Sequence, residues 1–205
     1  DVERSRGLGD VYKRQVITLV AGICLGTVHD ITLDPIAQAQ EAAATKTYQE
    51  VYPDAASFDE PQELADAVTA AADSISEWGF GKVTINDAKE ALDASGNQIG
   101  YLITSTSAES YGGNVQIAVG ITNEGELTGI GFLSISDTPG LGMRAKEPDF
   151  KDQFIGKKAE NLEVTKTGAS ADNQIEAISG ATITSKAVTN ATDAAIYFVA
   201  NCLAQ

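Results

Sequence analysis

The chain has 205 residues, of which 43% are hydrophobic, enough for one domain of ordinary size with a packed core. The formal net charge is −15, and the chain beyond residue 15 contains ten basic and 26 acidic residues. A surface with this charge repels nucleic acid and anionic lipid headgroups. One histidine, His29, and two distant cysteines, Cys24 and Cys202, argue against a zinc or iron–sulfur site and against a serine–histidine–aspartate triad. We therefore expect no nucleic-acid partner and no metal.

The N-terminal part contains an uncharged apolar stretch at residues 16–28. Its 13 residues are fewer than the about 20 that a helix needs to cross a bilayer. Three interpretations are open: the hydrophobic region of a signal peptide, a buried helix, or the second half of a transmembrane helix whose first half is missing. We favour the third. Residues 1–15 then form a non-native leader, and residues 16–29 are the remnant of a membrane anchor.

Residues 30–80 predict a helical linker and a further helical region. The Ala- and Gln-rich segment from Pro35 to about Tyr52 is typical of a helix, which Pro53 should end. Asp59 is the expected N-cap of a second helix. This helix is indicated by apolar residues at helical spacing, namely Leu64, Val68, Ala71, Ile75 and Trp78.

From Lys82 onward the pattern changes to strands joined by short turns. Strands are expected at 83–92, 98–107, 114–122 and 127–136, with turns at 95–97 and 123–126. A short helix at 148–155, a strand at 161–167 and a last helix at 185–203 follow. Consecutive strands with short turns form antiparallel sheets. The prediction is an α+β fold, an antiparallel sheet flanked by helices, in a domain of residues 81–205, with a truncated N-terminal transmembrane helix.

One loop of this domain stands out, the run Ser-Asp-Thr-Pro-Gly-Leu-Gly-Met-Arg at residues 136–144. Pro139-Gly140 is a turn signal, and Gly142 adds a second flexible point. Ten of the 19 glycines fall within residues 96–142, a density that suggests a backbone approached closely by a ligand. Taken alone, the loop could equally be a turn that ends a strand.

A second run, Ser-Gly-Ala-Thr-Ile-Thr-Ser-Lys at residues 179–186, precedes the last predicted helix. The pair Gly180-Ala181 lets a bulky group approach the backbone, and the Thr182 hydroxyl that follows has little steric cover. Taken alone, this run could be an ordinary helix N-cap, because serine and threonine are favoured there.

Both runs resemble motifs of the FMN-binding domain family, found in the G subunit of Rnf electron-transport complexes and in the C subunit of sodium-pumping NADH:quinone reductase. Three other segments match in order, so the resemblance covers about residues 30–205: Tyr111-Gly112-Gly113, Phe150 with Phe154, and Ile175-Glu176-Ala177-Ile178. In two places the chain departs from the family pattern: Asp137 replaces the usual Glu, and Glu176 replaces the usual Asp.

The resemblance implies a covalent FMN on Thr182. In the family, the threonine at this position holds FMN through a phosphodiester bond made by a separate flavin transferase with FAD as donor. Thr182 would therefore be an acceptor of modification, and the chain would have no catalytic residue of its own. The remaining cofactor-binding residues that the resemblance implies are Ser179 and Thr184 at the phosphate, Gly180 and Ala181 as space for it, and Thr138, Gly140, Leu141 and Gly142 against the isoalloxazine ring.

The function that the resemblance implies is an electron-carrying subunit of a membrane-bound Rnf-type ion-translocating complex, which is not an enzyme by itself. Its expected partners are the other subunits, a transient flavin transferase, and the membrane that its N-terminal helix enters. A single-pass protein with its soluble domain on the extracytoplasmic side would fit this role. Three alternatives stay open: a quinone-reductase C-type subunit, a stand-alone extracytoplasmic flavoprotein, and a flavin-free acidic binding module.

Overall fold

The computed structural model describes residues 2–158 and 161–203. By its internal contacts the chain divides into two compact units, Asp1–Ala44 and Thr45–Gln205. The second unit begins well before residue 81, because a strand at residues 57–59 pairs with the predicted sheet and a helix at residues 62–71 packs into its main core.

Helix α1 spans Val2–Val51 without interruption and includes Pro35 in its interior. Its apolar side chains between Val11 and Ile36 are exposed. By length and composition the part from Val11 to Val51 could cross a membrane, since its most apolar 18-residue window has a mean hydropathy of 1.8 and is 0% buried. A signal sequence near an N-terminus would meet the same criteria. The uncharged stretch 16–28 is therefore part of a longer helix.

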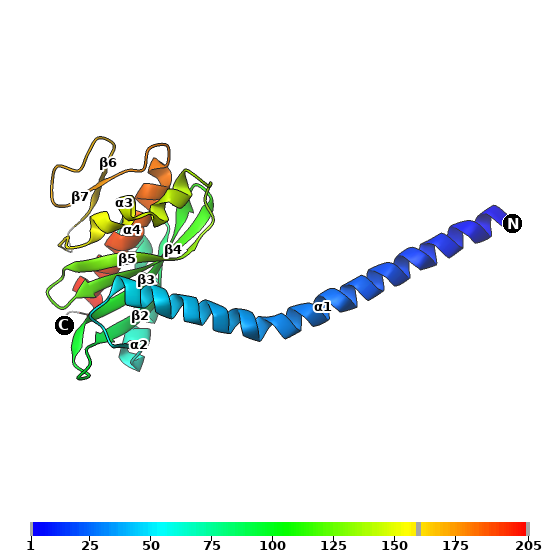
Figure 1. Ribbon diagram of the computed structural model, residues 1–205, viewed down its shortest axis with the longest axis horizontal. Coiled ribbons are helices and arrows are strands. Elements are labelled where there is room, and N and C mark those ends of the chain that lie inside the picture. The colour runs from blue at the N-terminus through cyan, green and yellow to red at the C-terminus, as the bar shows by residue number, and fades with distance from the viewer. Residues whose placement is uncertain (1, 159–160, 204–205) are drawn as a thin grey trace. The chain divides into compact units, whose positions relative to one another are not determined.

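The second unit is built on a five-stranded antiparallel sheet whose strands follow in chain order (Figure 1). The strands are β1 (Ser57–Asp59), β2 (Val83–Leu92), β3 (Gln98–Ser110), β4 (Gly113–Thr122) and β5 (Leu127–Ile135). The predicted antiparallel sheet and its four long strands are confirmed. Sequence reasoning missed β1, which pairs with residues 90–92 of β2. The expected helix N-cap at Asp59 is wrong, because Asp59 ends this strand and α2 (Gln62–Ala71) begins after Pro61.

The two faces of the sheet carry different kinds of residue, because side chains alternate along a strand. On β4, Val115, Ile117, Val119 and Ile121 are fully buried, as the alternation predicted, and belong to the main core. Helix α4 (Thr182–Phe198) covers this face and packs mostly against β3 (Figure 1). The domain is therefore an α+β fold with its longest core helix on one face of the sheet.

The opposite face of the sheet holds the last turns of α1. A Cβ atom at Gly131 would overlap the side chains of Thr47 and Val51, so the helix can approach only a bare backbone at this point. The Thr128 hydroxyl donates a 2.7 Å hydrogen bond to the Val51 carbonyl. The Tyr52 hydroxyl donates one of 2.8 Å to the carbonyl of Ile99. These contacts anchor the C-terminal end of α1 to the domain.

Short elements make the remaining connections, one between α2 and β2 and the others between β5 and α4. They are the 3-10 helices η1 (Ile75–Glu77), η2 (Gly142–Lys146) and η3 (Asp152–Phe154), helix α3 (Pro148–Lys151), and the strands β6 (Glu163–Thr165) and β7 (Gln174–Glu176), which pair in parallel. The strand expected at 161–167 is thus shorter, and the helix expected at 148–155 is split. Helix α4 begins three residues before the expected Ser185 and continues as a π-helical turn, η4 (Val199–Leu203).

Candidate functional site

Thr182 is the first residue of α4. It follows Gly180, which has a positive φ of +80°, and Ala181, the N-cap residue, whose side chain makes no capping hydrogen bond. The first backbone N–H groups of an α-helix have no partner within the helix, and alanine offers none from its side chain. The beginning of α4 therefore presents donor groups and the positive end of the helix dipole beside the Thr182 side chain.

The hydroxyl of Thr182 differs from the other Ser and Thr hydroxyls of α4. Four of them donate hydrogen bonds to protein oxygens, with partners as follows: Thr184 to Asp137 at 2.6 Å, Ser185 to the Ala181 carbonyl, Thr189 to the Ser185 carbonyl, and Thr192 to the Val188 carbonyl. Thr182 is half-buried, and within the described part of the chain its hydroxyl has no hydrogen-bond partner.

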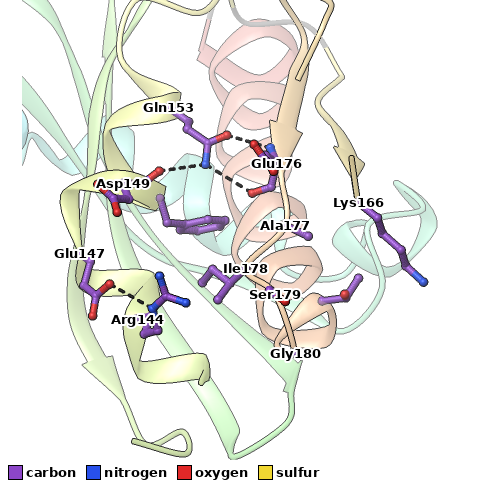
Figure 2. Close-up of a pocket in the computed structure, with 12 residues that line it drawn as sticks. Arg144, Glu147, Asp149, Gln153, Lys166, Glu176, Ala177, Ile178, Ser179 and Gly180 are labelled. Carbon is purple, nitrogen blue, oxygen red and sulfur yellow. Dashed lines mark hydrogen bonds and ion pairs between the residues drawn. The ribbon is translucent and has the colours of Figure 1, made fainter. Parts of the chain in front are cut away.

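Thr182 lines a pocket of about 450 Å³. Figure 2 shows the pocket between the segment that leads into α4 and the stretch from η2 to η3. Its volume lies within the range of about 300–1,000 Å³ that small-molecule sites occupy. The lining residues are Arg144, Glu147, Asp149, Phe150, Gln153, Lys166, Glu176, Ala177, Ile178, Ser179, Gly180 and Thr182. Three residues of the predicted attachment run, Ser179, Gly180 and Thr182, thus share one cavity, and Ala181 is buried beside them.

The pocket carries charges of both signs. The Arg144 Nε donates a 3.1 Å hydrogen bond to Glu147, and this pair lies at one wall (Figure 2). Lys166 adds a second cation, whereas Asp149 and Glu176 add acids. Sequence reasoning assigned no role to Arg144, although it ends the 136–144 run. Nothing in the sequence pattern pointed to Lys166, because only the folding of the chain brings this residue to the pocket.

Gln153 fixes the strand that leads into the attachment run. Its Oε1 accepts a 2.7 Å hydrogen bond from the Glu176 backbone N–H, and its Nε2 donates to the Glu176 carbonyl at 3.3 Å and the Asp149 carbonyl at 3.1 Å (Figure 2). The amide side chain thus pairs with both backbone groups of one β7 residue, as a neighbouring strand would. Sequence reasoning missed this residue because an isolated glutamine carries no recognisable signal.

The loop residues Thr138, Gly140, Leu141 and Gly142 stand next to this pocket without lining it. Leu141 is 43% exposed, and its Cδ2 would lie 3.1 Å from a Cβ atom at Gly180, so the loop touches the attachment run directly. Gly140 adopts a φ of +76° at the tip of the turn. Gly142 is buried against the Asp137 carboxyl group, where any Cβ would overlap it.

Asp137 connects the loop to the rest of the site. Its carboxylate accepts hydrogen bonds from the hydroxyls of Thr184 (2.6 Å) and Ser110 (2.8 Å) and from the Thr138 backbone N–H (2.7 Å). Burial raises the pKa of this carboxyl, but these hydrogen bonds and one from the Gly112 N–H outweigh burial and hold the pKa below its ordinary value. Thr184, expected beside the phosphate, is fully buried and directs its hydroxyl to Asp137.

Comparison with known proteins assigns this arrangement to a family. The sequence profile of the FMN-binding domain matches residues 110–197, a range that includes the whole pocket. The G subunit of the Na(+)-translocating ferredoxin:NAD(+) oxidoreductase complex of Acetobacterium woodii is 34% identical over 194 residues, which cover 91% of this chain and 88% of that protein. The chain belongs to the Rnf G-subunit family. The resemblance inferred from the two motifs is thereby confirmed.

Other members of the Rnf G-subunit family show the same extent of similarity. The G subunit of the proton-translocating ferredoxin:NAD(+) oxidoreductase complex of Clostridium ljungdahlii is 30% identical over 189 residues, covering 91% of this chain and 88% of that protein. Among solved structures, the C subunit of the Na(+)-translocating NADH-quinone reductase from Parabacteroides distasonis has a TM-score of 0.44 at 19% identity, covering 70% of this chain and 95% of that one. Membership in the G-subunit family follows from the sequence relatives.

Among the described residues, no group of three or more His, Cys, Asp or Glu side chains is placed to hold a metal ion. The pocket instead combines three acids, Glu147, Asp149 and Glu176, with the cations Arg144 and Lys166, and Arg144 is paired with Glu147. The site is thus a pocket of mixed charge that Thr182 lines, and the hydroxyl of Thr182 has no hydrogen-bond partner among the described residues.

Proposed function

We propose that this protein is the electron-carrying G subunit of a membrane-bound Rnf-type ion-translocating oxidoreductase complex, with FMN attached covalently to Thr182 through a phosphodiester bond. The observation that carries this proposal is the Thr182 hydroxyl itself. Thr182 lines the pocket at the beginning of α4, and its hydroxyl has no partner among the described residues, whereas the other four Ser and Thr hydroxyls of the helix are hydrogen-bonded.

The residues of the pocket fit FMN in kind. A flavin phosphate is anionic, and the first-turn N–H groups of α4, the Ser179 hydroxyl and Lys166 suit an anion, whereas Arg144 is already paired with Glu147. Phe150 in the pocket wall and the exposed Leu141 beside the pocket offer apolar surface to a flat aromatic ring. When bound, the flavin supplies the redox chemistry, and the protein supplies its position and surroundings. In this assignment Thr184 holds the loop through Asp137 and does not contact the phosphate.

Attachment needs a second protein. A threonine hydroxyl is a weak nucleophile without a base, and within the described part of the chain no carboxylate or histidine is hydrogen-bonded to Thr182. We assign the base to a flavin transferase that uses FAD. The Thr182 oxygen forms a bond to the phosphorus on the FMN side of FAD, the bond from that phosphorus to AMP breaks, AMP leaves, and the hydroxyl proton passes to the transferase.

The remaining subunits of the complex are the proposed lasting partners. The relatives from Acetobacterium woodii and Clostridium ljungdahlii are both named as the G subunit of a ferredoxin:NAD(+) oxidoreductase complex, one Na(+)-translocating and one proton-translocating. We propose the same kind of assembly here, in which the other subunits determine the coupling ion. The exposed apolar part of α1 supports a single membrane-spanning anchor. The extracytoplasmic side suits the soluble domain, because a covalent bond retains a flavin that could not be replaced there.

Flavin attachment is testable on the full chain. The protein is co-expressed with a flavin transferase, and denaturing gels are examined for flavin fluorescence that survives unfolding. Wild type should fluoresce and Thr182→Ala should be dark. Thr69→Ala is a matched control, because Thr69 is an exposed helical threonine whose hydroxyl bonds only the Ala65 carbonyl of its own helix, so this variant should fluoresce like wild type. A dark wild type, or fluorescence in Thr182→Ala, would contradict the proposal.

A further inference from the structure

Three segments that are far apart in the sequence meet at the Asp137 carboxylate. Ser110 comes from the end of β3, Thr138 from the loop itself, and Thr184 from the first turn of α4. The turn between β3 and β4 also presses against this point, because a Cβ atom at Gly112 would overlap the backbone of Ser136 and Asp137. One carboxylate therefore ties both motif runs and the β3–β4 turn into a single unit.

Asp137 also places a negative charge near the beginning of α4 through its bond to the Thr184 side chain. The N-cap residue Ala181 has no side-chain acceptor, so the first turn of the helix has no capping partner within its own segment. A carboxylate bonded to Thr184, the third residue of the helix, places negative charge near the positive end of the helix dipole. The beginning of α4 is thus held by a residue 47 positions earlier in the chain.

The contact to Thr184 fixes the rotation of the first helical turn. Residues two apart on an α-helix point in directions about 200° apart, because the helix has 3.6 residues per turn. When the Thr184 side chain is directed to Asp137, the side chain of Thr182 must point to the other side of the helix. The pocket lies there, since Thr182 lines it and Thr184 does not.

We propose that Asp137 is a positioning residue for flavin attachment: by holding Thr184 it keeps the first turn of α4 in the rotation that presents the Thr182 hydroxyl to the transferase and FAD. This inference rests on the proposed covalent attachment at Thr182. It implies that the transferase recognises a folded acceptor whose geometry is set before the two proteins meet. Asp137 touches neither the reacting hydroxyl nor, in this assignment, the phosphate.

The test measures initial rates of flavin transfer to the full, flavin-free chain by a purified transferase with FAD and Mg²⁺, over a range of acceptor concentrations. Thr184→Val removes the donor hydroxyl and keeps the shape, and Thr184→Ser keeps the donor. Asp137→Ala removes the acceptor. Asp93→Ala is its matched control, because Asp93 accepts backbone N–H bonds from Ser95 and Asn97 in the β2–β3 turn, as Asp137 does from Thr138.

We expect Thr184→Val and Asp137→Ala to lower kcat about tenfold or more, the factor that corresponds to losing a hydrogen bond to a charged group. The KM for the acceptor chain should change much less, because the docking surface stays in place. Thr184→Ser and Asp93→Ala should react like wild type. Thermal unfolding of each variant identifies the temperature at which all of them are folded, and rates are compared there.

Wild-type kcat in Thr184→Val would overturn the inference, even if Asp137→Ala fails to fold. An equal loss of kcat in Asp93→Ala would also overturn it, because this result would indicate a general effect of destabilisation. A rise in KM with kcat unchanged in Thr184→Val and Asp137→Ala would overturn it as well. An unlabelled wild type is a different result, since it contradicts the proposed attachment itself and not the role of Asp137.

Discussion

Gly180 combines two constraints at a single residue of the attachment run. Its φ of +80° favours glycine, and a Cβ atom would lie 3.1 Å from the Leu141 Cδ2. Gly180→Ala should therefore lower the free energy of unfolding by about 1 kcal/mol or more and slow flavin attachment, as denaturant titration and labelling rates would show.

Gly96 provides the control for this prediction. It has the same φ of +80° but no heavy atom within 4 Å of its Cβ position. Gly96→Ala should destabilise the domain through backbone strain alone and leave the rate of flavin attachment unchanged. Equal labelling of the two variants would contradict the role that we give to the Gly180–Leu141 contact.

Asp193, on the buried side of α4, should make stability depend on pH. Burial raises the pKa of its carboxyl from 3.8 to about 7, although the Leu162 N–H donates a 2.9 Å hydrogen bond to it. At pH values between 3.8 and about 7, this carboxyl is protonated in the folded state and ionised in the unfolded state. The folded state therefore binds more protons, and the contribution of this group to the free energy of unfolding falls as the pH rises.

Asp193→Asn keeps an acceptor for the Leu162 N–H and cannot ionise. This variant should be more stable than wild type at pH 8, and the difference should shrink at pH 5, where the carboxyl of wild type is protonated in the fold. Denaturant titrations at the two pH values measure both differences. A difference that does not depend on pH would rule out this titration.

The attachment run could be predicted at the residue scale, whereas its surroundings could not. Thr182, Ser179 and Gly180 lie together in a recognisable local sequence, and the structure places all three in one pocket. Gln153 on η3 and Lys166 just after β6 line the same pocket only because the whole fold brings these segments to it. Thr184 has a hydroxyl like that of Thr182, and only the packing of α4 against Asp137 separates their surroundings.

At the element scale, Gln153 joins η3 to β7, and this link predicts a local change in dynamics. Without the side-chain amide, the Glu176 N–H loses its 2.7 Å acceptor. Gln153→Ala should therefore speed amide hydrogen exchange in β7 while the exchange of the five-stranded sheet stays slow.

Gln62→Ala is the matched control for Gln153→Ala. The Gln62 amide bonds only an exposed carboxylate one turn along α2, that of Asp66. Its loss should leave exchange in β7 unchanged. Unaltered exchange of the Glu176 amide in Gln153→Ala would show that the hydrogen bonds to Gln153 do not hold this strand.

Strands in which apolar and polar residues alternate were predictable from the sequence. Elements whose bounds depend on pairing with another strand, or on contacts at a helix end, were not. The four long strands carry alternating apolar residues, and their turns contain glycine and asparagine, so local signals agreed with the fold. Strand β1 has three residues and exists because β2 offers it an edge. The beginning of α4 was placed at Ser185, because the residues before it have weak helical preference; Asp137 stabilises the first turn from a distance.

At the scale of the whole molecule, the acidic surface and the apolar helix α1 predict how the full chain behaves in cells. The net charge of −15 gives no attraction to anionic lipid headgroups, so direct association of this chain with lipid must come from apolar burial of α1. The full chain should stay in the membrane fraction after a high-salt wash and dissolve in detergent. Release by salt alone would contradict a membrane-spanning role for α1.

Covalent flavin at Thr182 is the claim on which the electron-carrying role depends. The measurement that tests it most directly is peptide mass spectrometry of the full chain, purified after co-expression with a flavin transferase and digested under denaturing conditions. We expect the peptide that contains Thr182 to gain the mass of FMN less one water, with fragment ions that place the gain on Thr182. An unmodified peptide, or a flavin on any other residue, would contradict the account.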